Sequence, residues 1–191
     1  MQQYHLKLFS KIPTLETERL VLRRMMLDDL DDVFEYASQP EVPKYLLWYP
    51  HEDKSFTAQY LRIVDKKYKK NEFYDWAVTF NGKMIGTAGF TSFDVLNNSA
   101  QIGYVLNKNY WGKGIASEAA RAVITFGFEA LGLNRIEAKF IPENNSSRRV
   151  LEKCGMKFEG SHHEAIRAKG RYLDIEIYAI TRSEYEKIKS K

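Results

Sequence analysis

Two glycines and a lysine precede a long run of small and apolar residues in the segment NYWGKGIASEAARAVITFGFEALG, residues 109 to 132. Gly112 and Gly114 flank Lys113, and the pattern predicts a helix that begins near Ile115. The first N–H groups of a helix lack partners within it, and a glycine lets an anion approach the backbone closely. We therefore predict that this loop binds a phosphate group, to which the helix dipole contributes about 0.3–1 kcal/mol.

Two familiar phosphate-binding motifs do not describe this loop. A P-loop needs GxxxxGK followed by Ser or Thr, whereas here Lys113 lies between the glycines and Gly114-Ile115 follows it. A dinucleotide fingerprint needs a third small position, where Ser117 stands, and parallel strands around it, whereas the neighbouring strands are predicted to be antiparallel. A tight turn that precedes a helix and binds no ligand is the remaining alternative.

The elements that position this loop follow the order β-α-α-β-β-β-α-β-α-β-β. Alternating and helical apolar spacings predict strands over 19–25, 73–80, 83–93, 97–106, 135–140, 156–162 and 172–180, and helices over 27–38, 55–69 and from near 115. The segment 142–155 predicts a further short helix, with Asn/Ser capping residues before it and Gly155 after it. Asn81-Gly82 predicts a two-residue hairpin between two of the strands. This order predicts an α+β domain with one mostly antiparallel sheet that helices cover.

The helix predicted over 55–69 has an apolar stripe and a basic surface. The stripe consists of Phe56, Tyr60, Ile63, Val64 and Tyr68. Lys66, Lys67, Lys69 and Lys70 are interpreted as a solvated face rather than a binding patch.

The composition is that of an ordinary globular protein. Of the 191 residues, 44% are hydrophobic and 28% are charged, and the net charge of +4 is too small to favour nucleic acid as a partner. The single cysteine, Cys154, excludes an internal disulfide and is interpreted as a small buried hydrophobe. Because the chain has no 18-residue apolar run, we expect no membrane span and a cytoplasmic location.

The strand AQIGYVL, the loop YWGKGIA, the helix SEAARAVITFGFEALG, the strand RIEAKF and the segment PENNSSRRVLEKCGMKFEG resemble the GNAT acetyltransferase superfamily. More narrowly, they resemble its Rim-type branch, named for ribosomal-protein N-terminal acetyltransferases. The match runs from PTLETERLVLRRM to YAITRSEYE with the same order and spacing. The resemblance implies one GNAT-like domain over residues 1–191, with about seven strands and about four helices, and acetyl-CoA as cosubstrate.

The resemblance also implies which residues bind the cofactor. The family's pyrophosphate loop, Gln/Arg-x-x-Gly-x-Gly/Ala, falls on Trp111 to Ala116, where Trp111 replaces the usual polar residue. The expected diphosphate-binding residues are therefore the ones whose backbone amides remain: Gly112, Lys113, Gly114, Ile115, Ala116 and Ser117. Lys113 is expected to add a point charge.

Further roles implied by the resemblance fall on the strand before the loop and on the last predicted helix. The pantetheine arm is expected to pair with Gly103, Tyr104, Val105 and Leu106, with Gly103 at a bulge that splays the sheet. Asn144 is expected to bind a pantetheine amide, and Ser147 to protonate the departing thiolate. The alternative for both residues is that they only cap the helix.

The general base is the open point of this mechanism. Many relatives have Glu in AEIGY, but this chain has Gln101, which does not accept a proton at neutral pH. An α-amine with a pKa of roughly 7.7–8.0 is about a tenth neutral near pH 7, whereas a lysine at roughly 10.4 is about 4–5 kcal/mol from its neutral form. We therefore favour an α-amine acceptor with water relaying the proton, and we keep Asp94 and Glu164 as alternative bases.

Other candidate sites are weaker. His162 and His163 are adjacent on a predicted strand, face opposite ways and cannot chelate one metal, and we expect no metal cofactor. Tyr45, Trp48 and Tyr49 either line the acceptor cleft or pack against the second helix.

The sequence therefore predicts direct acetyl transfer in a ternary complex, with a protein N-terminal α-amine as the acceptor. The alternatives are acetylation of a small-molecule amine (a polyamine, an amino sugar or an antibiotic) and a non-catalytic sensor that binds acyl-CoA. Exposed strand edges in such sheets often pair, so a homodimer is the oligomer to test.

Overall fold

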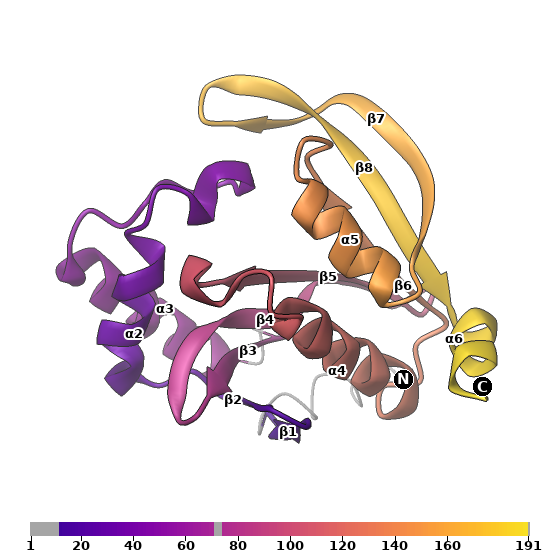
Figure 1. Cartoon of the computed structure of the whole chain (residues 1–191), viewed down its shortest axis with the longest axis horizontal. Coiled ribbons are helices and arrows are strands. Elements are labelled where there is room, and N and C mark those ends of the chain that lie inside the picture. Colours follow the sequence, from indigo (N-terminus) through magenta and orange to yellow (C-terminus); the bar gives the residue numbers. More distant parts are fainter. Residues whose placement is uncertain (1–11, 71–73, 191) are drawn as a thin grey trace.

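A single mixed sheet organises the computed structural model, which describes residues 12–70 and 74–190 (Figure 1). Its strands are β1 (Leu15–Glu16), β2 (Leu20–Arg23), β3 (Tyr74–Phe80), β4 (Lys83–Asp94), β5 (Ser99–Leu106), β6 (Arg135–Phe140), β7 (Lys157–Ala168) and β8 (Arg171–Thr181), in the order β1-β2-β3-β4-β5-β6-β8-β7. Among these described strands, only β5 and β6 pair in parallel. The predicted fold class is confirmed, and the two-residue β1 brings the described strands to eight.

Helices lie on both faces of this sheet. They are α2 (Leu30–Ala37), α3 (Lys54–Lys69), α4 (Ile115–Glu129), α5 (Asn145–Lys153) and α6 (Arg182–Lys189), with short 3-10 turns η1 (Leu27–Asp29), η2 (Val42–Tyr45) and η3 (Lys108–Tyr110). The unpredicted α6 starts at a capping box, in which Glu184 accepts hydrogen bonds from the backbone and the hydroxyl of Thr181. Phe73, expected to open a strand, lies outside the described residues.

The buried residues form two hydrophobic cores, and the helices divide between them. Trp76 and Val78 of β3 belong to the core that contains α4, whereas Ala77 belongs to the core that contains α2 and α3. Because successive strand residues point to opposite faces, α4 and α5 cover one face of the sheet, and α2 and α3 cover the other. Figure 1 shows α2 and α3 at one end of the molecule, with α4 and α5 along the middle.

The apolar stripe predicted for α3 is partly wrong. Phe56 and Ile63 are 53% and 47% exposed, and the helix instead buries Thr57, Leu61, Val64 and Tyr68. Thr57 is tolerated in the core because its hydroxyl lies 2.9 Å from Nδ1 of His51, so its polar atom has a partner.

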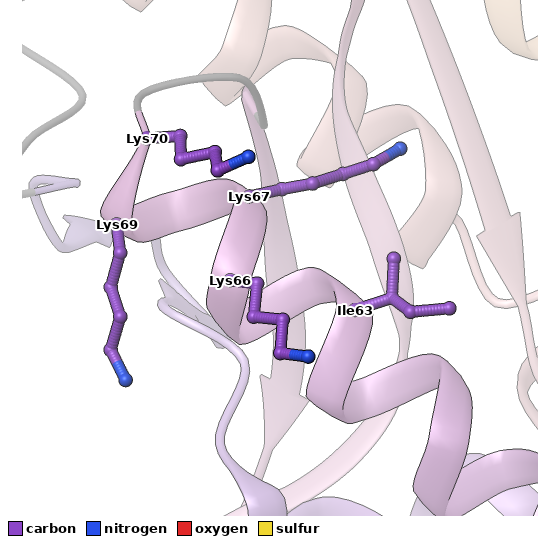
Figure 2. A pocket seen from close by; sticks show the side chains of 5 residues that line it. All are labelled: Ile63, Lys66, Lys67, Lys69 and Lys70. Carbon is purple, nitrogen blue, oxygen red and sulfur yellow. The ribbon is translucent and has the colours of Figure 1, made fainter.

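The basic end of α3 forms a hollow lined by Ile63 and the four lysines Lys66, Lys67, Lys69 and Lys70 (Figure 2). The lysine side chains spread in different directions rather than converging, and Lys69 pairs with Asp65 at 2.7 Å. We place no ligand there.

The sheet opens between β5 and β6. Their parallel pairing runs from Ser99 opposite Arg135 to Ile102 opposite Ala138 and then stops, although β5 continues to Leu106. The predicted splay is therefore present, but the predicted bulge is not at Gly103, which stays paired with Gly89. The bulge lies in β4 at Thr91, and a Cβ on Gly103 would come within 2.9 Å of the Thr91 methyl group. Gly103 makes room for the bulge on its neighbour.

Candidate active site

The loop between β5 and α4 presents a row of free backbone donors. Gly112 and Gly114 have φ values of 75° and 76°, a conformation that favours glycine, and α4 begins directly afterwards at Ile115. Within the described chain, the first amide of α4 that donates to an acceptor belongs to Glu118, which bonds to the carbonyl of Gly114 at 3.1 Å. The amides of the residues from Gly112 to Ser117 are therefore available to an anion.

The predicted diphosphate residues divide into an exposed and an anchored group. Gly112, Lys113 and Gly114 are exposed, Ala116 is half-buried, and the side chains of Ile115 and Ser117 are buried beneath them. The buried side chains of Ile115 and Ser117 anchor the first turn of α4 in the protein interior, next to the exposed residues of the loop.

Trp111 ties this loop to the strand that precedes it. Its indole Nε1 donates a 2.7 Å hydrogen bond to the carbonyl of Leu106, the last residue of β5. Trp111, which replaces the usual polar residue of the family motif, therefore links the loop to the end of β5. The carbonyl of Leu106 is consequently already engaged.

The ammonium of Lys113 turns back from the helix start. Its Nζ donates to the carbonyl of Asn109 at 2.9 Å and lies 5.3 Å from the centre of the Tyr110 ring. The predicted point charge at the diphosphate requires this side chain to leave those partners, so that role of Lys113 stays a prediction.

A cation that sequence reasoning missed lies beside the loop instead. The guanidinium of Arg19 donates to the carbonyl of Lys113 at 3.0 Å and pairs with Glu118 at 2.6 Å. Glu118 also accepts hydrogen bonds from the hydroxyl of Thr17 and from the backbone amide of Arg19. The ion pair of Arg19 with Glu118 joins the turn before β2 to the first turn of α4 and neutralises the carboxylate nearest the loop. The two residues are 99 positions apart in the chain, so no sequence motif indicates the pair.

Ser147 and Tyr104 meet on the face of the sheet that α5 covers. The two hydroxyl oxygens are 2.7 Å apart, and the Tyr104 hydroxyl also donates to the carbonyl of Ser147 at 3.2 Å. Burial raises the pKa of Tyr104, so its phenol stays protonated at neutral pH. The structure thus joins the expected proton donor to an expected cofactor residue.

Asn144 caps α5. Its side-chain oxygen accepts a hydrogen bond from the backbone amide of Ser147 at 3.1 Å. The capping alternative is therefore observed for Asn144, while its amide nitrogen keeps two donors for a ligand. The Ser147 side chain does not cap the helix but contacts Tyr104.

The open edge of β5 lies between the two cores. Tyr104 packs against the core of α4 and α5, and Val105 packs against the core of α2 and α3. Residues 103–106 have left β6, so one side of residues 103–105 is available to an extended ligand, as expected for pantetheine, whereas the carbonyl of Leu106 is engaged by Trp111.

The structure places both alternative bases named from the sequence, Asp94 and Glu164, at exposed positions. Asp94 accepts hydrogen bonds from the backbone and the side-chain amide of Asn97, which hold the pKa of its carboxyl below the usual value at the tip of a hairpin. Glu164 is exposed on a bulged part of β7, with φ 47°. Neither carboxylate is enclosed at the open edge of β5.

The aromatic residues after α2 lie in two groups. Trp48 packs against the core of α2 and α3, and its ring lies 5.5 Å from that of His51. Tyr49 is 66% exposed and lies 5.7 Å from Nζ of Lys169, which also donates to the carbonyl of Pro43. The tip of the β7–β8 hairpin therefore reaches the segment around η2, and Tyr45 lies beneath the ammonium of Lys44.

Cys154 is buried as predicted, and burial raises the pKa of its thiol to about 11. Within residues 12–70 and 74–190, no three His, Cys, Asp or Glu side chains gather where they could hold a metal ion. No helix in the same part of the chain is long and apolar enough to cross a membrane.

Comparison with known proteins agrees with this arrangement. The chain matches the acetyltransferase (GNAT) domain family over residues 19–157. The N-acetyltransferase p20 of Bacillus licheniformis is 39% identical over 174 residues, covering 90% of this chain and 98% of p20. The crystal structure of a GNAT-family acetyltransferase from Bacillus anthracis is 32% identical, with a TM-score of 0.79, over 90% of this chain and 99% of that one.

A more distant similarity concerns the fold. RimL, a ribosomal-protein α-N-acetyltransferase solved in complex with coenzyme A, is 21% identical, with a TM-score of 0.75, over 88% of this chain and 98% of RimL.

The chain combines a mostly antiparallel sheet with a splay between β5 and β6 and a helix start lined by free backbone amides. The chain belongs to the GNAT acetyltransferase family, which confirms the resemblance stated from the sequence, and it is an N-acetyltransferase.

Proposed function

We propose that this protein transfers the acetyl group of acetyl-CoA to the α-amine of a cytoplasmic protein N-terminus, by direct attack in a ternary complex. The observation that carries the cofactor half of this proposal is the run of unpaired amides from Gly112 to Ser117, next to the open edge of β5. Coenzyme A is the ligand of RimL, whose fold this chain shares.

The residues present fit such a cofactor. The amides from Gly112 to Ser117 would bind the diphosphate, and the open edge of β5 would pair with the pantetheine arm. Asn144 has free amide donors for the same arm, and Ser147 would protonate the thiolate with support from Tyr104.

The acceptor half of the proposal depends on the proton that the amine must lose. Gln101 occupies the position where many relatives carry a carboxylate, and a missing strong base penalises lysine far more than an α-amine. A small-molecule amine is the alternative acceptor, and a homodimer stays a prediction to be tested by sedimentation.

The cofactor half is tested by calorimetric titration of acetyl-CoA into wild type, Gly114→Trp and Gly132→Trp. Both glycines have open surroundings, so all three proteins should fold. Both also have positive φ, so a tryptophan brings a similar backbone penalty at either position, and Gly132→Trp is a matched control. We expect wild type and Gly132→Trp to bind and Gly114→Trp to lose at least tenfold in affinity. Equal binding by all three would place the cofactor elsewhere.

The acceptor half is tested with two peptides of one sequence. One has a free α-amine and no lysine, and the other has a blocked N-terminus and one lysine. We expect thiol release with the first peptide at a kcat/KM at least 100-fold higher, because the lysine starts about 2.5 pKa units further from its neutral form. A faster reaction with the blocked peptide, or with polyamines and amino sugars, would contradict this acceptor.

A further inference from the structure

The side chain of Arg19 holds one backbone carbonyl of the loop before α4. Its Nη1 donates to the carbonyl oxygen of Lys113 at 3.0 Å, and its Nη2 lies 3.6 Å from the point where a Cβ of Gly114 would stand. The peptide between Lys113 and Gly114 is trans, so its carbonyl and its N–H point in opposite directions. The N–H of Gly114 therefore points away from the guanidinium, and it has no acceptor among the described residues.

The next peptide plane is fixed by the helix itself. The backbone amide of Glu118 donates to the carbonyl of Gly114 at 3.1 Å, so the N–H of Ile115 points out of the start of the helix. Gly114 is left-handed and Ile115 is the first residue of α4. A left-handed residue next to a right-handed one turns successive N–H groups into one concavity that binds anions. We therefore expect the amides of Gly114, Ile115 and Ala116 to line one side of the loop.

The glycines of this loop also make its shape easy to change. Glycine takes φ values of either sign at little steric cost, so the peptide between Lys113 and Gly114 can rotate about its two flanking bonds. Such a rotation exchanges the N–H for the carbonyl oxygen, whose partial negative charge repels a phosphate. The hydrogen bond from Arg19 opposes this rotation, because a charged donor makes a strong hydrogen bond with the carbonyl.

Arg19 is anchored at its other end by a carboxylate. Its Nε and Nη2 donate to one oxygen of Glu118 at 2.7 and 2.6 Å. The other oxygen accepts hydrogen bonds from the hydroxyl of Thr17 at 2.6 Å and from the backbone amide of Arg19 at 2.9 Å. The Glu118 side chain is only 11% exposed, so salt screens this ion pair less than a pair at the surface. The guanidinium is therefore held in place before any ligand arrives.

We propose that Arg19 is a positioning residue for the cofactor, because its hydrogen bond to the Lys113 carbonyl keeps the N–H of Gly114 directed at the diphosphate of acetyl-CoA. This inference rests on the proposed function. Trp111 replaces the polar residue of the family motif, so the diphosphate depends on backbone amides, whose direction Arg19 controls. A loop that already has its binding conformation binds more tightly, because no ordering cost remains to be met on binding.

The test separates this positioning from the effect of charge. Arg19→Ala removes the guanidinium and keeps the backbone amide that binds Glu118. The double variant Arg19→Ala/Glu118→Gln removes two opposite charges together, so the net charge beside the loop equals that of wild type while the Lys113 carbonyl still lacks its donor. Glu118→Gln alone keeps the donor. The control Arg62→Ala removes an exposed arginine from α3, on the other face of the sheet.

Two measurements are made on each protein. Calorimetry gives the Kd of acetyl-CoA, and thiol release with the α-amine peptide gives kcat and the KM of acetyl-CoA. We expect Arg19→Ala and the double variant both to bind about tenfold more weakly, with KM raised by the same factor and kcat at saturating acetyl-CoA unchanged. Glu118→Gln and Arg62→Ala should bind within about threefold of wild type.

Three results would overturn the inference. Wild-type affinity in the double variant would mean that Arg19 acts only by neutralising Glu118, and an unchanged Kd in Arg19→Ala would mean that it does not act on the loop. A lower kcat with an unchanged KM is the result of a merely structural role, which reduces the folded fraction. If wild type binds no acetyl-CoA, the cofactor half of the proposed function fails and this inference fails with it. If wild type binds and only the variants differ from expectation, the proposed function stands.

Discussion

Asp75 of β3 has a carboxyl oxygen that is buried without a hydrogen-bond partner among the described residues, and this carboxyl leads to a prediction about stability. Burial raises the pKa of this group from 3.8 to about 7, so the folded protein holds the proton over a range where the unfolded chain has released it. Below pH 3.8 both states are protonated and the group has no effect. Between pH 3.8 and 7 the unfolding free energy falls as the pH rises, and above pH 7 the full loss is present.

The magnitude follows from the shift. About three pKa units at 1.36 kcal/mol each amount to about 4 kcal/mol of unfolding free energy lost between pH 4 and pH 8. For a chain of this size that loss corresponds to a decrease of about 10 °C in Tm. Asp75→Asn keeps the shape of the side chain and removes the titration, so it should lack this part of the decrease.

The assay is urea unfolding of wild type, Asp75→Asn and the control Asp31→Asn, whose carboxyl is 78% exposed on α2, at pH 5, 6, 7 and 8. We expect the advantage of Asp75→Asn over wild type to grow by about 1.4 kcal/mol for each pH unit up to pH 7 and then to level off. Asp31→Asn should follow wild type. If the curves of wild type and Asp75→Asn stay parallel from pH 5 to 8, the carboxyl is not buried in the way described here, and the reasoning is refuted.

Two further predictions concern the cofactor site. Arg19→Ala removes the hydrogen bond to the Lys113 carbonyl and leaves Glu118 without its cation. We therefore expect calorimetry to show an acetyl-CoA affinity lower by about tenfold. An unchanged Kd would mean that the loop keeps its shape without this contact. Ser147→Ala keeps the Asn144 cap, since that hydrogen bond uses the backbone amide of residue 147. We expect kcat to fall by about 10- to 100-fold with acetyl-CoA affinity unchanged, because the hydroxyl next to Tyr104 is lost. A normal kcat in stopped-flow thiol release would mean that Ser147 has only a packing role.

Local signals in the sequence were sufficient wherever a short segment determines its own structure. Gly112 and Gly114 adopt positive φ, α4 starts at Ile115, and Asn81-Gly82 forms its hairpin with φ values of 50° and 81°. These features depend on a few neighbouring residues, whose steric limits are nearly independent of the rest of the chain.

The spacing of apolar residues was less informative about which face of a helix is buried. On α3 the predicted stripe included Phe56 and Ile63, which are exposed, because spacings of three and four residues fit more than one helix face. The partner that allows Thr57 to be buried, His51, comes from the preceding loop, and periodicity contains no information about it.

The sequence by itself determined the order of strands and helices from β2 to β8, the glycine loop before α4, the family and the glutamine at position 101, because each is a property of contiguous residues. Only the tertiary structure decided that Arg19 reaches Lys113 and Glu118, that Tyr104 meets Ser147, and that a carboxyl oxygen of Asp75 is buried. The physical reason is that these contacts depend on strand register and sheet order, which join residues far apart in the chain. A buried carboxyl and an exposed one look alike in a sequence, and it is the fold that withdraws Asp75 from water and raises its pKa.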